Sequence, residues 1–158
     1  MRGFNLDEID VKLLTMLQAD GRMSQHDLAE AVGLSSPATG ERLRKLEDRG
    51  IIKGFTAIVD PKLLGFDVTA FIAVGIDGSR FYQDFVERVQ AHPEIQECHT
   101  VTGQGSHLLK IRTGDTSTLE HLLAELQSWP GVNWTTTSIV LSALKEGTDL
   151  VLKDVPPE

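Results

Sequence analysis

The stretch LAEAVGLSSPATGERLRKLEDRGIIKGF, residues 28–55, decides the fold of the first part of the chain. Just before it, Ser24 is suited to cap a helix, and Gly33 is suited to end that helix because glycine readily adopts a left-handed backbone. Ser35 is the natural cap of a following helix, which Gly50 ends. The pattern therefore predicts two short helices joined by a tight turn, a helix-turn-helix.

Flanking segments complete this first domain. Apolar residues recur at helical spacing from Leu6 to Leu17, which predicts an amphipathic helix. Residues 51–59 are rich in β-branched and aromatic side chains, which favours a small hairpin or wing, or a strand leading out of the domain. Asp60-Pro61 breaks the pattern. We expect a winged helix-turn-helix domain over residues 1–60 and a hinge over residues 61–65.

The second part of the chain alternates between strand and helix patterns. We expect strands at residues 66–77, 95–102, 107–113 and 132–143, and helices at residues 81–89 and 119–126. The order βαββαβ is typical of a ferredoxin-like domain, with both helices on one face of an antiparallel sheet. We place this domain at residues 66–144 and a tail at residues 145–158, with a loose end at Pro156-Pro157. The fold class is thus α+β, and the uncovered sheet face favours a homodimer.

Composition narrows the possible functions. The 158-residue chain has a net charge of −8, one cysteine, and no apolar run near the roughly 20 residues that span a bilayer. Its acidic start is unlike a signal peptide, so we expect a cytoplasmic protein without a membrane partner. Residues 1–60 hold eight Lys/Arg and ten Asp/Glu. Any binding to nucleic acid must therefore come from a local patch and weaken steeply with salt.

The second helix of a helix-turn-helix can lie in the major groove of double-stranded DNA, its N-terminal part near base edges and its later cations near phosphates. The alternative is a solvated helix whose cations pair with Glu41, Glu47 and Asp48, and for Arg44, Lys45 or Arg49 individually both readings stay open. Gly40 is unusual here, since glycine costs about 1 kcal/mol relative to alanine inside a helix. The candidate DNA-binding residues are Ser35, Ser36, Ala38, Thr39, Arg42, Arg44, Lys45 and Arg49.

Several motifs together resemble the Lrp/AsnC family of bacterial and archaeal transcription regulators. They are LDEIDVKLLTMLQADGRMS (residues 6–24), DLAEAVGLS (27–35), ERLRKLEDRGIIKGFTAIVDPKLLG (41–65) and VTGQGSHLLKI (101–111). The resemblance covers nearly the whole chain. It implies DNA binding as a homodimer, assembly of dimers into higher oligomers such as an octamer, and often an amino-acid effector held between dimers.

The candidate effector site is the turn before the third sheet strand together with threonines of the last strand. Glycine amides in the turn could hold a carboxylate, and the hydroxyl groups could complete the hydrogen bonds. In the family this turn usually reads glycine, two variable residues, then aspartate, whereas serine stands in the last place here. The alternative is an ordinary hairpin turn beside a strand in which threonine is favoured. The candidate residues are Gly103, Gln104, Gly105, Ser106, Thr135 and Thr137.

Enzyme chemistry lacks a matching motif. The sequence contains no nucleophile elbow, phosphate loop or zinc-ligand spacing, and its five histidines are dispersed. We therefore expect no catalytic residue, metal or cofactor. Two alternatives to an effector-controlled regulator stay open. One is an architectural DNA-binding protein without an effector. The other is a subunit like those of siroheme decarboxylase, whose histidine-rich signature residues 97–100 (ECHT) do not reproduce.

Overall fold

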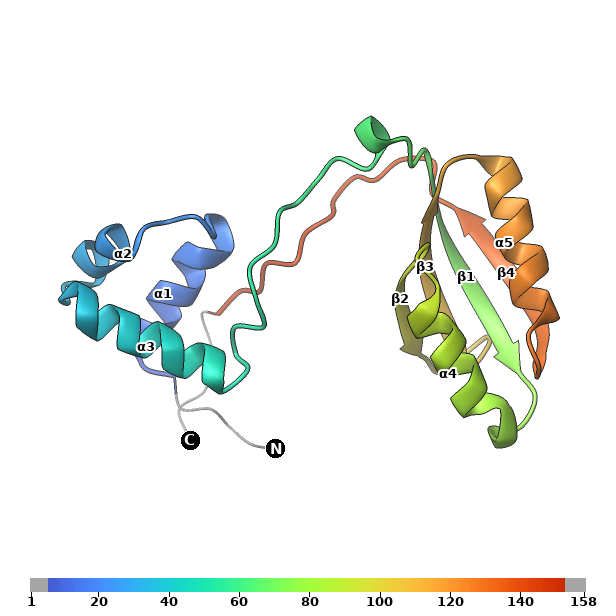
Figure 1. The fold of residues 1–158 in the computed structure, drawn as a ribbon, viewed down its shortest axis with the longest axis horizontal. Helices are drawn as coiled ribbons and strands as arrows, with labels where there is room; N and C mark the ends of the chain where they lie inside the picture. Colours follow the sequence, from blue (N-terminus) through green and yellow to red (C-terminus); the bar gives the residue numbers. More distant parts are fainter. Residues whose placement is uncertain (1–5, 153–158) are drawn as a thin grey trace. The chain divides into compact units, whose positions relative to one another are not determined.

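The computed structural model describes residues 6–152 and divides them into two units (Figure 1). One unit holds the described residues up to Ile58 together with those from Glu146, and the other holds Val59–Lys145. The helices of the first unit are α1 (Glu8–Ala19), α2 (Gln25–Val32) and α3 (Ser36–Asp48).

The predicted caps of the helix-turn-helix form as expected. The Ser24 hydroxyl accepts a hydrogen bond from the backbone N–H of Asp27 at 3.1 Å, and the Ser35 hydroxyl accepts one from Ala38 at 3.4 Å. Gly33 ends α2 with a left-handed φ of 70°, which an L side chain rarely adopts. The three helices share a small core of buried apolar side chains, made of Leu13, Leu14, Leu28, Ala29 and Leu46.

The predicted hairpin or strand over residues 51–59 is absent from this single chain. Ile51 and Ile52 close the end of α3 by donating their backbone N–H groups to the Leu46 carbonyl, and the first strand begins only at Val68. Phe55 is 56% and Ile58 93% exposed. The residue types suit a strand, but a strand also needs a neighbour for its backbone hydrogen bonds, and no described segment of this chain supplies one.

The second unit has the predicted βαββαβ order. In chain order its elements are the 3-10 helix η1 (Lys62–Leu64), β1 (Val68–Ile76), the 3-10 helix η2 (Ser79–Phe81), α4 (Tyr82–Ala91), β2 (Ile95–Thr100), β3 (His107–Thr113), α5 (Thr116–Ser128) and β4 (Val132–Ile139). The strands form one antiparallel sheet in the order β2-β3-β1-β4. β2 and β4 end before the predicted residues 102 and 143.

Both helices of this unit cover the same face of the sheet (Figure 1). Alternate residues of β1 and β3 point into this layer, where they pack against Phe85 of α4 and Leu122 of α5, all fully or almost fully buried. Neither helix of this unit covers the opposite face. That face carries the large apolar side chains of Phe71 and Trp134, each 38% exposed.

The described part of the C-terminal tail attaches to the first unit. The side-chain amide of Gln18 on α1 pairs with the backbone of Leu150, accepting from its N–H at 2.7 Å and donating to its carbonyl at 3.2 Å. The loose end predicted at residues 156–157 lies outside the described residues. Among residues 6–152, none of the helices has the length and apolar character needed to cross a membrane.

Candidate nucleic-acid interface

The turn between α2 and α3 is fixed by a side chain that explains Gly40. Gln25, the first residue of α2, donates its amide to the Ser36 carbonyl at 2.5 Å. This amide lies across Gly40, where an added Cβ would come within 2.6 Å of the Gln25 nitrogen. The glycine that lowers the helix propensity of α3 therefore makes room for a contact that sets the angle of the turn.

The predicted base-contacting residues in the N-terminal part of α3 differ from one another in exposure. Ser35 and Ala38 are exposed and Ser36 is half-buried, so these three lie where a groove could reach them. Thr39 is 0% exposed, and its hydroxyl has no hydrogen-bond partner among the described residues. The prediction that Thr39 contacts DNA is therefore wrong for this structure, because its side chain packs into the core of the first unit.

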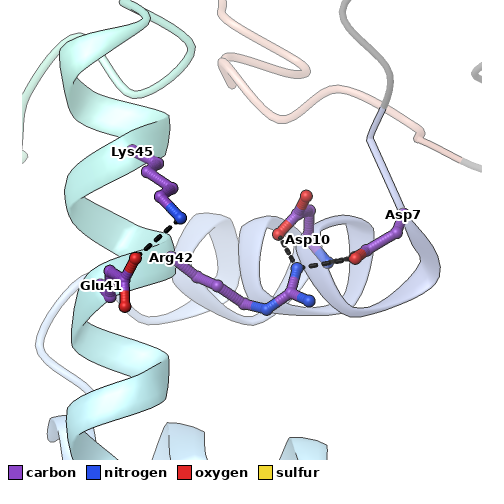
Figure 2. Close-up of polar contacts among 5 residues, drawn as sticks. All are labelled: Asp7, Asp10, Glu41, Arg42 and Lys45. Carbon is purple, nitrogen blue, oxygen red and sulfur yellow. Dashed lines mark hydrogen bonds and ion pairs between the residues drawn. The ribbon is translucent and has the colours of Figure 1, made fainter.

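Arg42 is held by two carboxylates at the start of α1 (Figure 2). Its Nη1 lies 2.7 Å from Asp7 Oδ2 and 2.8 Å from Asp10 Oδ1. These two hydrogen-bonded carboxylates, Asp7 first, raise the pKa of the Arg42 guanidinium. The pKa of Asp7 is lowered, first by the backbone N–H of Asp10 and then by Arg42. Arg42 was predicted to contact a base or a phosphate, but here it ties α3 to α1.

The other cations on or at the end of α3, Arg44, Lys45 and Arg49, form no ion pair with Asp7 or Asp10. Lys45 pairs with Glu41 at 2.8 Å, but both side chains are more than 60% exposed, so the pair is readily exchanged for another partner (Figure 2). Arg44 and Arg49 are exposed and take part in none of the ion pairs found among residues 6–152. Between α1 and α3 lies a hollow of about 330 Å³ that Arg42, Lys45 and Arg49 line together with two carboxylates.

This arrangement of side chains on α3 is suited to binding in a groove of DNA. A capped helix offers small and hydroxyl-bearing side chains at its N-terminal end, where base edges are met, and three exposed cations further along, where phosphates are met. Its tertiary contacts fix it from two sides, through Gln25 on α2 and through Asp7 and Asp10 beside α1. Such fixing is needed if side chains are to meet base edges in a constant register.

Comparison with known proteins identifies the family. A profile described as Lrp/AsnC ligand binding domain matches residues 69–150, and one described as winged helix-turn-helix DNA-binding matches residues 6–53. The chain belongs to the Lrp/AsnC family. The HTH-type transcriptional regulator FL11 of Pyrococcus horikoshii is 40% identical over 148 residues, which cover 94% of this chain and 97% of that relative.

Further Lrp/AsnC relatives agree over nearly their full lengths. The leucine-responsive regulatory protein of Escherichia coli K12 is 40% identical over 154 residues, covering 96% of this chain and 94% of that relative. A transcriptional regulator of Neisseria meningitidis, solved as a complex with L-Met, is 35% identical with a TM-score of 0.89, covering 94% and 97% of the two chains. The present chain is thus a DNA-binding transcriptional regulator with a two-domain α+β fold.

The relatives also indicate the class of protein. The Lrp/AsnC family consists of transcriptional regulators, and the relatives named above are regulators by description. Within residues 6–152, no group of three or more His, Cys, Asp or Glu side chains is placed to hold a metal ion.

Three of the six predicted effector residues, Gly105, Ser106 and Thr135, lie beside Val74 of β1. Ser106 donates its backbone N–H to the Val74 carbonyl at 2.9 Å, and its hydroxyl lies 3.3 Å from the same oxygen. On the other side of β1, Thr135 is the register partner of Val74, and its hydroxyl accepts from Gln127 of α5 at 3.0 Å. Gly103 and Gln104 are exposed at the tip of the turn, Gly105 and Thr137 are half-buried, and Thr137 pairs with Ile72. The hydroxyls of Ser106 and Thr135 are therefore already engaged within the chain.

Two features of the interface were missed by sequence reasoning. The carboxylates that hold Arg42 lie more than thirty residues before it, and no local pattern links them to α3. The burial of Thr39 had a signal, because Thr39, Leu43 and Leu46 recur at helical spacing and so belong to the inward face of α3.

Proposed function

We propose that this Lrp/AsnC regulator reads specific DNA sites by placing the N-terminal end of α3 in the major groove. Ser35, Ser36 and Ala38 face the base edges, while Arg44, Lys45 and Arg49 contact phosphates. The observation that carries the proposal is the exposure of these residues on a helix that tertiary contacts fix from two sides. Thr39 and Arg42 are left out of the proposed contacts because both act within the fold.

In this proposal the protein binds DNA as a homodimer, and homodimers assemble further, up to an octamer. Two features support self-association. The sheet face opposite the helices exposes the large apolar side chains of Phe71 and Trp134, and the segment around Phe55 and Ile58 exposes strand-forming residues without a strand partner among the described residues. A dimer presents two α3 helices to half-sites about one helical turn apart or a multiple of it. Sedimentation of the full chain, and of a Phe71→Glu variant expected to dissociate, tests this arrangement.

Control by an amino acid between dimers is the third part of the proposal. The backbone amides of the turn at residues 103–106 would hold the carboxylate, and Ser106 stands where a family aspartate would meet the ammonium group. L-methionine is the first probe because a structural relative is a complex with it. The effector can shift assembly only if it has different affinities for the different assemblies.

An effector-independent architectural protein is the second candidate function. It is favoured by one observation, the engagement of the Ser106 and Thr135 hydroxyls within the chain. Calorimetric titration with each of the twenty amino acids separates the two functions. Heat with L-methionine or another amino acid supports the effector-controlled regulator, whereas no heat with any of them supports the architectural protein.

Sequence-specific binding is tested by recovering bound fragments from random genomic DNA. Retention of a small set of fragments sharing a two-fold repeated motif is expected at moderate salt. Equal retention of all fragments would overturn sequence-specific reading. A Ser36→Tyr and Ala38→Glu pair of variants, both on the exposed end of α3, should abolish the preference and leave the fold intact.

A further inference from the structure

A second concave site lies between α4 and the edge strand β2. It is a cleft of about 430 Å³, within the size range of small-molecule sites. Tyr82, Val86 and Val89 of α4 form one wall, Ile95 and Cys98 belong to the strand side, and His107 of β3 also lines the cleft. None of the predicted effector residues lines it.

His107 is the unusual residue of this cleft. It is 3% exposed, and its ring packs at 4.8 Å from the Phe85 ring and 5.7 Å from the Tyr82 ring, measured between centroids. Burial lowers the pKa of its imidazole, which is therefore neutral at pH 7. Its Nδ1 lies 2.8 Å from the Ser106 hydroxyl, whereas its Nε2 is buried and has no hydrogen-bond partner among the described residues.

The hydrogen bonds of Ser106 decide whether the Nε2 atom of His107 is a hydrogen-bond donor or an acceptor. The Ser106 hydroxyl also lies 3.3 Å from the Val74 carbonyl, which can only accept, so the hydroxyl donates to Val74 and accepts from the Nδ1–H of His107. In a neutral imidazole with a proton on Nδ1, Nε2 carries a lone pair. A buried acceptor without a partner is rare in native proteins and favours binding of a donor.

We propose that the α4–β2 cleft binds a small molecule that has an apolar body and donates one N–H or O–H group to Nε2 of His107. Val86, Val89 and Ile95 supply apolar contact for the body of the molecule. A neutral acceptor selects against anions and for neutral donors such as an aromatic alcohol or a ring N–H. This site does not rest on the proposed DNA contacts. Because His107 also bonds Ser106, a molecule bound in the cleft would act directly on the turn at residues 103–106.

The test uses two probes of matched shape, p-cresol and p-xylene, which differ by a hydroxyl in place of a methyl group. Backbone NMR of the full chain follows each titration. We expect shifts at cleft residues and a preference for p-cresol of about fivefold, the size of one net hydrogen bond. In a His107→Phe variant, which keeps an aromatic ring, the preference should fall to about onefold while p-xylene still binds.

Two controls keep the test decisive. Val86→Trp fills the cleft and should remove binding of both probes, whereas Thr135→Val, at the predicted effector site, should leave both unchanged. If His107→Phe fails to fold, nitrogen NMR of the imidazole in the native chain replaces it, and the Nε2 resonance should move on addition of p-cresol but not of p-xylene. Equal affinity for the two probes, shifts confined to residues outside the cleft, or no binding by either would overturn the proposal.

Discussion

Arg42 was predicted to contact DNA, but in the structure it holds α3 against α1. Replacing Arg42 with methionine tests which of these two roles the side chain has. Arg42→Met keeps the apolar stem of the side chain but removes the guanidinium that bonds Asp7 and Asp10. The Arg42 side chain is 32% exposed, Asp7 51% and Asp10 14%. The Asp7 pair is therefore screened and contributes little, whereas the Asp10 carboxylate would stay half-buried without its partner. Hydrogen bonds to charged groups and exposed pairs together suggest a loss of about 1–2 kcal/mol in unfolding free energy.

The pH dependence of this loss has a definite sign. The pKa of Asp7 is lowered in the folded chain, first by the backbone N–H of Asp10 and then by Arg42. A carboxyl group with a lowered folded-state pKa contributes stability above its unfolded pKa, and this contribution is lost as pH falls through the folded-state pKa. The variant keeps the backbone contribution but loses that of Arg42. The difference between native chain and variant in urea unfolding should therefore shrink below about pH 4.

DNA binding supplies the second readout for Arg42. Arg44→Met is the matched control, because Arg44 is an exposed cation of the same helix. We expect Arg44→Met to change unfolding free energy by less than about 0.5 kcal/mol and to reduce the salt slope of binding by about 1 per subunit. Arg42→Met should leave the salt slope unchanged. Native stability with a reduced slope in Arg42→Met would refute the reasoning, since Arg42 would then contact DNA.

Three further predictions concern single contacts of the first unit. Gly40→Ala gains about 1 kcal/mol of helix propensity but displaces the Gln25 amide. The free energy of unfolding in urea should therefore change little in the native chain and rise by about 1 kcal/mol in a Gln25→Ala background. Equal gains in both backgrounds would contradict the contact. Thr39→Val removes a buried hydroxyl without a partner, so it should raise unfolding free energy by about 1 kcal/mol and leave DNA affinity unchanged; weaker binding would argue that Thr39 reaches DNA. Gln18→Ala should accelerate amide exchange at Leu150 about tenfold, because this N–H donates to Gln18; unchanged exchange would show that the tail is held elsewhere.

Local chemistry explains why so much of the helix-turn-helix was predictable. Caps and left-handed glycines act within four residues, so Ser24, Gly33 and Ser35 mark helix ends whatever the rest of the chain does. Strand ends depend instead on neighbours. Residues up to Ala143 suit a strand, but the register of β4 with β1 runs only to Ile139, opposite Ala70. Residues 51–59 fail as a strand for the same reason.

Contacts between elements were beyond sequence reasoning. Nothing in α3 indicates that Arg42 meets carboxylates 32 and 35 residues earlier, since the packing of α3 against α1 decides it. The cleft at His107 likewise combines side chains of α4, β2 and β3, which lie apart in the sequence. At Arg42 a polar residue was assigned from its own position in the chain, and its partners turned out to come from another part of the chain.

The net negative charge of the chain and the small number of unpaired cations on α3 limit how tightly one subunit can bind DNA. Of the four cations on or at the end of α3, one is committed to the fold and one shares its charge with Glu41, which leaves Arg44 and Arg49 as exposed cations without an ion pair among the described residues. With a net charge of −8, the chain as a whole is not drawn to phosphates. Non-specific affinity, which depends on the number of phosphates neutralised, should therefore be weak for one subunit. Tight binding must come from two or more α3 helices engaged at once, so assembly itself becomes the quantity that a regulator of this kind can control.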